Sequence, residues 1–173
     1  MSVPTVNTRW LIALCSLLAP ALLAAGHGGD TVVEETEART IVDPSGRQVS
    51  LPAEVKRIGC LTGASYEKAF LVGAADKVVV RAATFPPWME QTRPAISKVP
   101  VIRNSHSPNM EELLKLAPDV LFSWDDPLLT RQMERNGLTV VSPQPVRNHL
   151  ASEQDFIDLL KAEVAVYGKV LGA

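Results

Sequence analysis

A helix followed by a buried strand is predicted by residues 109–124, which run NMEELLKLAPDVLFSW. Asn109 is a residue type that caps helix N-termini, and the leucines after it are spaced to give the helix one apolar side. Pro118 cannot continue the helix, and the apolar run behind it has the composition of a strand enclosed on both faces. The stretch therefore predicts a helix over 110–116 and a strand over 119–124.

The same alternation of strands and helices extends on both sides of this stretch. Outside it the predicted elements are, in chain order, a β-hairpin over 39–52, a strand over 57–61, a helix over 66–72, a strand over 77–81, a weaker extended segment over 97–102, a helix over 128–136, a strand over 138–141 and a helix over 153–171. Strands and helices that alternate with short connections are typical of a parallel sheet covered by helices. We therefore expect an α/β fold with a parallel sheet flanked by helices, preceded by a small β-hairpin.

Two segments carry more specific expectations. Ser65 is expected to cap the helix over 66–72, and Glu67 and Lys68 are expected to lie on its solvent side. The proline-rich segment over 84–88 is expected to be a loop.

The N-terminus has the pattern of an export signal. Arg9 precedes an apolar run from Trp10 to Ala25, which is shorter than the roughly 20 apolar residues that a membrane-spanning helix needs. A positive flank, a short apolar core and small residues at its end are typical of a secretory signal peptide, with an uncut membrane anchor as the alternative. We expect a signal peptide over 1–25, a flexible leader over 26–38, and an exported mature chain without stable membrane insertion.

Composition argues against some functions. The formal net charge is −2 and no cluster of lysine and arginine stands out, so nucleic-acid binding has no electrostatic support. Aromatic residues make up only 5% of the chain, which argues against a broad stacking surface. Of the two cysteines, Cys15 falls in the predicted signal peptide, and Cys60 lies in an apolar strand, where we expect a buried small hydrophobic residue.

Candidate ligand-binding residues follow the predicted strands. In an open parallel sheet, ligands bind outside the carboxyl ends of the strands. The segments at that edge hold three aromatic residues, a cation and an imidazole, which are Tyr66, Trp88, Trp124, Arg103 and His106. Aromatic rings bury the organic surface of a ligand, while arginine or histidine meets a carboxylate, an oxygen or a metal. This set predicts a site for a large, flat or anionic metal complex.

Each of these residues also has a structural alternative. Trp88 can fold a proline-rich loop against the sheet, and Tyr66 can be an ordinary packing residue. Trp124 stands two residues after Phe122, so it can belong to the same buried layer. His106 can be a solvated loop residue, because no second histidine, cysteine or carboxylate stands at metal-ligand spacing.

Catalysis has little support in the sequence. Residues 63–66, GASY, lack the Gly-x-Ser-x-Gly pattern of a nucleophile elbow, and no glycine-rich phosphate loop is visible. No nucleophile, base and orienting group are placed together by the sequence. We therefore expect no enzyme, no cofactor and no metal site of the protein's own.

Six stretches together resemble a known family. They are residues 41–52, 55–58, 71–79, 109–121, 137–141 and 167–172, and they include IVDPSGRQVSLP, LVGAADKVV and NMEELLKLAPDVL. In order and spacing the combination is similar to the binding proteins of ABC importers for ferric siderophores, haem and cobalamin. The resemblance covers nearly all of the chain after the leader.

The resemblance implies two α/β lobes joined by a long helix, with the ligand held between the lobes and an importer permease as the partner. It implies an N-terminal ligand-binding lobe over 39–150 and the start of the connecting helix over 151–173. Family members are about twice as long, so we expect a truncated chain without the second lobe, whose helix from Glu153 exposes an apolar stripe. The resemblance also implies permease docking by Glu111 and a ligand contact by Trp124.

We therefore predict the substrate-binding component of an ABC importer, carrying an iron chelate, haem or a corrinoid and performing no chemistry. A molybdate or metal-ion binding protein of the same fold is an alternative, with oxygen and imidazole ligands in place of aromatic contacts. An exported α/β enzyme and a non-functional truncated remnant are alternatives from other classes.

Overall fold

Five parallel strands form the central sheet in the computed structural model, which describes residues 38–84, 86–144 and 151–172. In spatial order the strands are β5 (Val101–Ile102), β4 (Val78–Ala82), β3 (Ile58–Cys60), β6 (Val120–Phe122) and β7 (Val140–Val141). Every neighbouring pair in this order is parallel. The predicted α/β fold with a parallel sheet is therefore confirmed.

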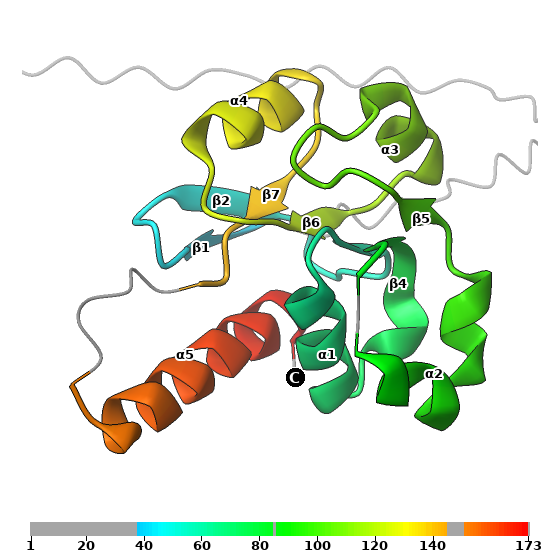
Figure 1. Ribbon diagram of the computed structural model, residues 1–173. Coiled ribbons are helices and arrows are strands. Elements are labelled where there is room, and N and C mark those ends of the chain that lie inside the picture. Colours follow the sequence, from blue (N-terminus) through cyan, green and yellow to red (C-terminus); the bar gives the residue numbers. More distant parts are fainter. Residues whose placement is uncertain (1–37, 85, 145–150, 173) are drawn as a thin grey trace, which may run out of the picture. The chain divides into compact units, whose positions relative to one another are not determined.

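Helices cover both faces of the sheet (Figure 1). One face carries α3 (Met110–Leu116) and α4 (Pro127–Arg135), and the other carries α1 (Gly63–Leu71), α2 (Pro87–Thr92) and α5 (Glu153–Leu171). Alternate residues of a strand point to opposite faces, so each face has its own apolar core. Phe122 packs in the core shared with α1 and α5, and its neighbour Leu121 packs in the core shared with α3 and α4.

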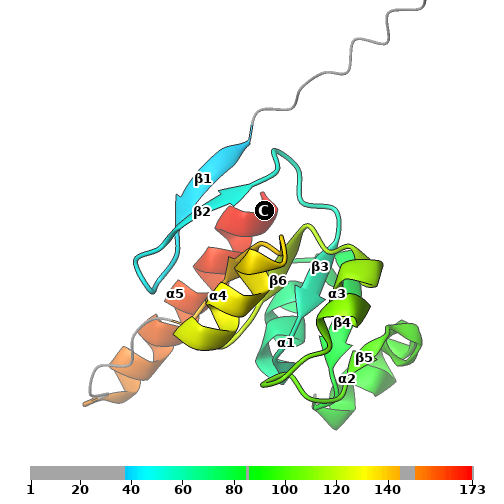
Figure 2. The same cartoon turned by 90° about the horizontal axis from the view of Figure 1, so that it is seen from above.

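The predicted hairpin is confirmed, and two arginines fasten it to the helices. β1 (Arg39–Val42) and β2 (Gln48–Leu51) pair antiparallel, and Figure 2 shows them beside the C-terminal end of α5. Arg39 donates hydrogen bonds to backbone carbonyls in the last turn of α5. Arg47, in the turn of the hairpin, pairs with Glu134 of α4 at 2.9 Å. The hairpin is therefore attached to helices on both faces of the sheet.

α1 differs from its sequence prediction in its start and in the side that it exposes. The predicted start at residue 66 with Ser65 as the cap is wrong. The helix begins at Gly63, because Thr62 is extended and its hydroxyl accepts a hydrogen bond from the Ser65 backbone N–H at 2.9 Å. Lys68, predicted to face solvent, is only 8% exposed and pairs with Glu163 of α5 at 3.5 Å. A contact far away in the sequence therefore buries this charge.

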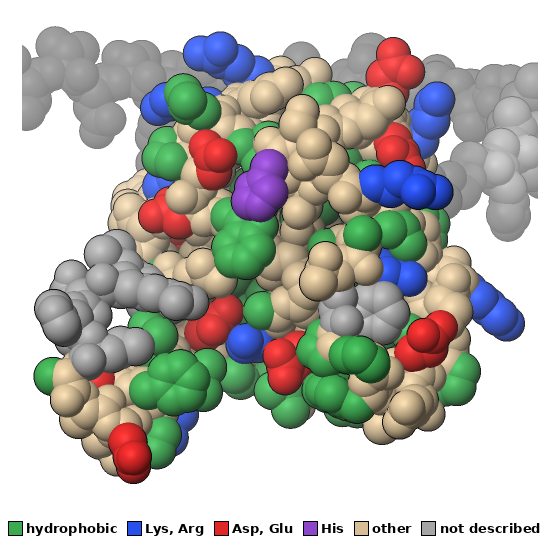
Figure 3. Space-filling model, viewed as in Figure 1, with side chains coloured by type: hydrophobic (Ala, Val, Ile, Leu, Met, Phe, Trp, Pro, Cys, Tyr) green, Lys and Arg blue, Asp and Glu red, His purple; other side chains and the backbone are tan. Residues whose placement is uncertain are grey.

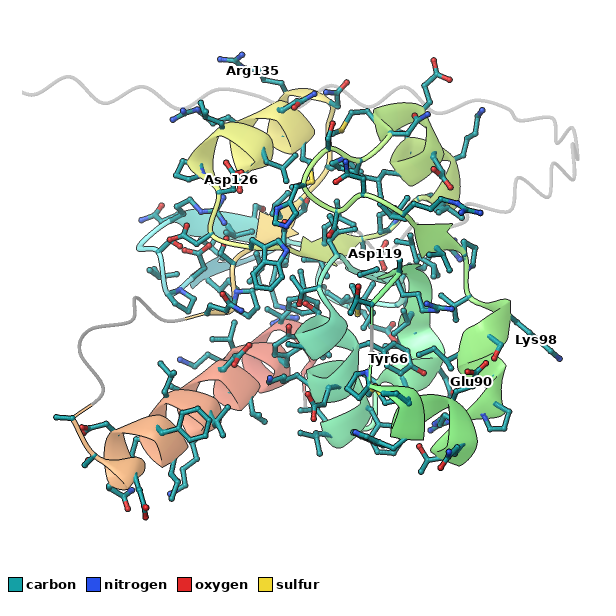
Figure 4. All side chains as sticks on the ribbon, viewed as in Figure 1. Tyr66, Glu90, Lys98, Asp119, Asp126 and Arg135 are labelled. Atoms are coloured by element: carbon teal, nitrogen blue, oxygen red, sulfur yellow. The ribbon has the colours of Figure 1, made fainter. Side chains whose placement is uncertain are left out.

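Three further elements begin or end at other residues than predicted, each for a local reason. The expected proline-rich loop contains α2, which begins at Pro87 because proline suits the first position of a helix. The extended segment expected over 97–102 is reduced to β5, since a short 3₁₀ turn occupies Pro94–Lys98. α4 begins at Pro127, one residue before its predicted start, and its cap is the carboxylate of Asp126, labelled in Figure 4.

The last helix, α5, has the predicted bounds at both ends. Ser152 and Asp155 form a capping box at its start, and Gly172, with φ of +72°, ends it. The predicted apolar stripe is exposed in the first half of the helix, where Phe156 is 50% exposed. In the second half, Tyr167 is fully buried against the sheet. The helix is therefore held to the sheet through its C-terminal half.

The predicted signal peptide and leader lie outside the described residues, apart from Ala38. The lobe predicted over 39–150 is described except at residues 85 and 145–150. None of the helices in these described parts is both long and apolar enough to cross a membrane.

Candidate functional site

A hollow of about 660 Å³ lies at the carboxyl ends of the strands. Four segments line it, and each of them follows or ends a strand: residues 61–64 with Glu67 after β3, residues 82–84 with Pro86 at β4, residues 103–106 after β5, and Trp124 after β6. Parallel strands end at the same edge of a sheet, so the segments after them converge. The hollow lies at the edge where the sequence predicted a ligand site.

Three of the predicted ligand residues, Arg103, His106 and Trp124, line this hollow. The rings of His106 and Trp124 are stacked, with centroids 6.0 Å apart and an angle of 11° between their planes. Figure 3 shows a histidine lying against hydrophobic side chains on the face toward the viewer. The side-chain oxygen of Asn104 accepts a hydrogen bond from the His106 backbone N–H at 3.1 Å, which fixes the loop. The pair offers a flat surface to a ligand.

Trp124 also carries an unpaired hydrogen-bond donor. Its indole N–H is buried and has no hydrogen-bond partner among the described residues. Its backbone is held, because its carbonyl accepts hydrogen bonds from the Ser142 hydroxyl at 3.3 Å and from the Asp126 backbone N–H at 2.9 Å. Buried indole N–H groups usually find an acceptor, so this unpaired donor is an exception among the described residues.

The other two predicted ligand residues lie outside the lining of the hollow. Tyr66 is 2% exposed and belongs to the core that contains Met89 of α2; its position is labelled in Figure 4. Trp88 lies on α2 and is 41% exposed, with its ring edge-to-face against Phe70 at 6.2 Å. Both residues have packing contacts, which were their structural alternatives, so we leave them out of the site proposed below.

Glu67 was missed as a site residue. From the sequence it was assigned only to the solvent side of its helix, whereas it lies in the wall of the hollow. Its helix starts at Gly63 instead of residue 66, so Glu67 lies in the first turns of α1, close to the strand ends. Recognising Thr62 as the cap would have revealed this position, because threonine is also a common N-cap residue.

The described residues offer neither an enclosed metal site nor a reactive thiol. They contain no group of three or more histidine, cysteine, aspartate or glutamate residues arranged to hold a metal ion. Cys60 is fully buried in β3, as predicted, and burial raises the pKa of its thiol well above the usual value. The thiol therefore stays protonated and packs as a small apolar group.

A family model described as periplasmic binding protein matches residues 58–162, which is more than half of the chain. The chain belongs to the periplasmic binding protein family. The matched region begins at β3 and includes every segment that lines the hollow. No curated protein matches the chain. The resemblance found in the sequence is confirmed at the level of the family.

Solved structures of periplasmic binding proteins share the fold of this chain. The molybdate-bound MolA of Haemophilus influenzae has a TM-score of 0.65 at 21% identity, covering 78% of this chain and 46% of its own. The siderophore binding protein BauB has a TM-score of 0.61 at 17% identity, covering 79% and 46%. A periplasmic solute binding protein of Veillonella parvula has a TM-score of 0.59 at 22% identity, covering 77% and 45%. The chain thus spans less than half the length of these proteins.

Glu111, the docking residue predicted for this periplasmic binding protein, lies outside the lining of the hollow. It is exposed in the first turn of α3. The side-chain oxygen of Asn109 accepts a hydrogen bond from its backbone N–H at 3.0 Å, so the cap predicted from the sequence is confirmed. A carboxylate is favourable at this positive end of a helix and remains available to a partner. Docking by Glu111 stays a prediction.

Proposed function

We propose that this chain forms one wall of the ligand site in the substrate-binding component of an ABC importer, and that its ligand is an iron chelate, haem or a corrinoid. The proposal is carried by one observation: Arg103, His106 and Trp124 converge on a single hollow at the carboxyl ends of the sheet. A volume of about 660 Å³ lies within the range of pockets that hold small organic ligands.

The chemistry of these three side chains suits an organic metal complex. The stacked imidazole and indole rings of His106 and Trp124 give a flat apolar surface for the organic shell of such a ligand. The guanidinium of Arg103 supplies donors for carboxylate or other oxygen atoms. A bare molybdate ion would leave the aromatic surface and most of the volume unused.

One of two similar structures was solved with a ligand of this class. MolA was solved with molybdate, and BauB was solved with ferric iron complexed by two molecules of acinetobactin. Both are periplasmic or siderophore binding proteins with the fold of this chain, and the aromatic pair favours the chelate over the oxyanion here.

The remaining parts of the proposal concern export and docking. We propose that residues 1–25 direct the chain to the periplasm, that residues 26–38 form a leader, and that residues 151–173 begin a connecting helix. Glu111, exposed at the start of α3, is proposed to dock into an arginine pocket of the importer permease. The chain would bind and deliver its ligand without changing it.

Ligand binding is tested by tryptophan fluorescence. We expect haem, cobalamin, a ferric trihydroxamate or a ferric tricatecholate to quench the fluorescence saturably at micromolar concentration. The apparent affinity should fall in Trp124→Phe and stay unchanged in Trp88→Phe, because Trp124 lines the hollow and Trp88 does not. N-acetyltryptophanamide, titrated in parallel, corrects for light absorbed by the coloured ligands. No saturable quenching by any of the four in a folded chain would contradict the proposal, as would an unchanged affinity in Trp124→Phe.

A further inference from the structure

The hollow is lined by two side chains of opposite charge. Glu67 comes from α1 and Arg103 from the segment after β5. Within the described residues, neither of them takes part in an ion pair. Apart from His106, the other lining residues are of uncharged types, so the carboxylate and the guanidinium balance each other.

We propose that Glu67 selects the ligand by charge, so that the hollow takes a metal complex whose net charge is close to zero. Such a ligand directs hydrogen-bond donors or a cationic group toward Glu67 and oxygen acceptors toward Arg103. This inference rests on the proposed function and narrows it to a substrate class. It predicts weaker binding of multiply charged anions, because the carboxylate of Glu67 repels them.

The packing of α1 keeps Glu67 on the hollow. Tyr66 and Lys68, the residues before and after it, are 2% and 8% exposed. Each is held on its own side of the helix, Tyr66 in the apolar core and Lys68 by its ion pair with Glu163. α1 therefore cannot turn Glu67 away from the hollow without exposing both neighbours. Because Lys68 is already paired, it does not neutralise Glu67.

Electrostatics in such a hollow are strong enough to discriminate between ligands. Charges near a protein surface interact several-fold more strongly than they do in bulk water, since the protein side has a low dielectric constant. A carboxylate enclosed by a ligand must also keep hydrogen-bond donors around it, and an oxygen-rich anion offers none. A neutral complex that carries N–H or O–H groups meets both requirements.

The test compares two hexadentate ferric complexes of similar size. A trihydroxamate complex is neutral, whereas a tricatecholate complex is triply negative. We expect the full-length wild-type chain to bind the neutral complex more tightly, as measured by equilibrium dialysis. Glu67→Gln should strengthen tricatecholate binding about tenfold, and Arg103→Gln should weaken it by a similar factor. Binding of the neutral complex should change less than about threefold with Glu67→Gln, because glutamine still accepts hydrogen bonds.

Glu112→Gln is the matched control, because Glu112 is an exposed glutamate on α3 that does not line the hollow. It removes the same charge and should leave both affinities unchanged. If a complex binds but Glu67→Gln has no larger effect on the tricatecholate than Glu112→Gln, the role of Glu67 is overturned while the proposed function stands. If neither complex binds, and haem and cobalamin also fail to bind, the proposed function fails and this inference fails with it.

Discussion

The Glu163→Ala variant is expected to have a free energy of unfolding about 3–5 kcal/mol lower than the wild-type chain. Glu163 on α5 and Lys68 on α1 form an ion pair of 3.5 Å, and their side chains are only 9% and 10% exposed. Removing the carboxylate leaves the ammonium group enclosed without its partner, and an unpaired buried charge is strongly unfavourable. The measurement is urea unfolding followed by circular dichroism.

An exposed pair on the same helix supplies the control. Asp158 and Lys161 lie 3.7 Å apart, with side chains 60% and 71% exposed. Asp158→Ala should change the free energy of unfolding by less than about 1 kcal/mol, since exposed pairs contribute little. Replacing both buried partners, Lys68→Met with Glu163→Leu, should recover most of the lost stability because no charge is left unpaired. Equal small losses in Glu163→Ala and Asp158→Ala would contradict an enclosed ion pair.

The Tyr167→Ala variant should lose a similar amount, about 3–5 kcal/mol of the free energy of unfolding. Tyr167 is fully buried, and its ring stacks on that of Phe122 in β6 with centroids 4.1 Å apart. The substitution leaves a cavity between α5 and the sheet, where the surrounding side chains can relax only in part. Urea unfolding again gives the value.

Phe156 is the matched control for Tyr167, because it is an aromatic residue on the same helix but is 50% exposed. Phe156→Ala should lower the free energy of unfolding by no more than about 1 kcal/mol. The difference between the two variants measures which half of α5 is packed on the sheet. A larger loss for Phe156→Ala than for Tyr167→Ala would mean that the N-terminal half of α5, and not its C-terminal half, is packed on the sheet.

Elements with strong local signals could be predicted closely from the sequence. α3 has the predicted bounds because Asn109 caps it and Pro118 stands just after its end, and both effects act within a few residues. α5 also has the predicted bounds, since Ser152 and Gly172 supply local start and stop signals. The order of the strands in the sheet follows from no such local signal.

Features that depend on distant contacts could not be predicted in this way. Lys68 resembles an ordinary exposed lysine until Glu163 of α5 is packed against it. Two further residues of α1 were also assigned to the wrong surroundings, because the start of the helix was predicted wrongly. Tyr66 was assigned to the ligand site and Glu67 to solvent, whereas Tyr66 is buried and Glu67 lines the hollow.

The location of the candidate site was more predictable than its members. Arg103, His106 and Trp124 follow strands directly, and the topology of a parallel sheet brings such residues together. Trp88 follows a strand less closely and is carried away on α2, a helix of six residues that begins at Pro87. The strand-end rule therefore identifies the right edge of the sheet, but it does not give the direction in which an intervening helix carries a side chain.

Binding of the ligand in the hollow beside Trp124 is tested most directly by the indole signal of this residue in a proton–nitrogen correlation NMR spectrum. The chain has three tryptophans, Trp10, Trp88 and Trp124, and single tryptophan-to-phenylalanine variants assign their signals. The probe is a gallium trihydroxamate, which has the charge of the ferric complex and is diamagnetic. We expect the Trp124 signal to shift saturably, because a ligand in the hollow changes the surroundings of the Trp124 ring, while the Trp88 signal stays in place. Saturable binding that moves the Trp88 signal and leaves the Trp124 signal unchanged would contradict it.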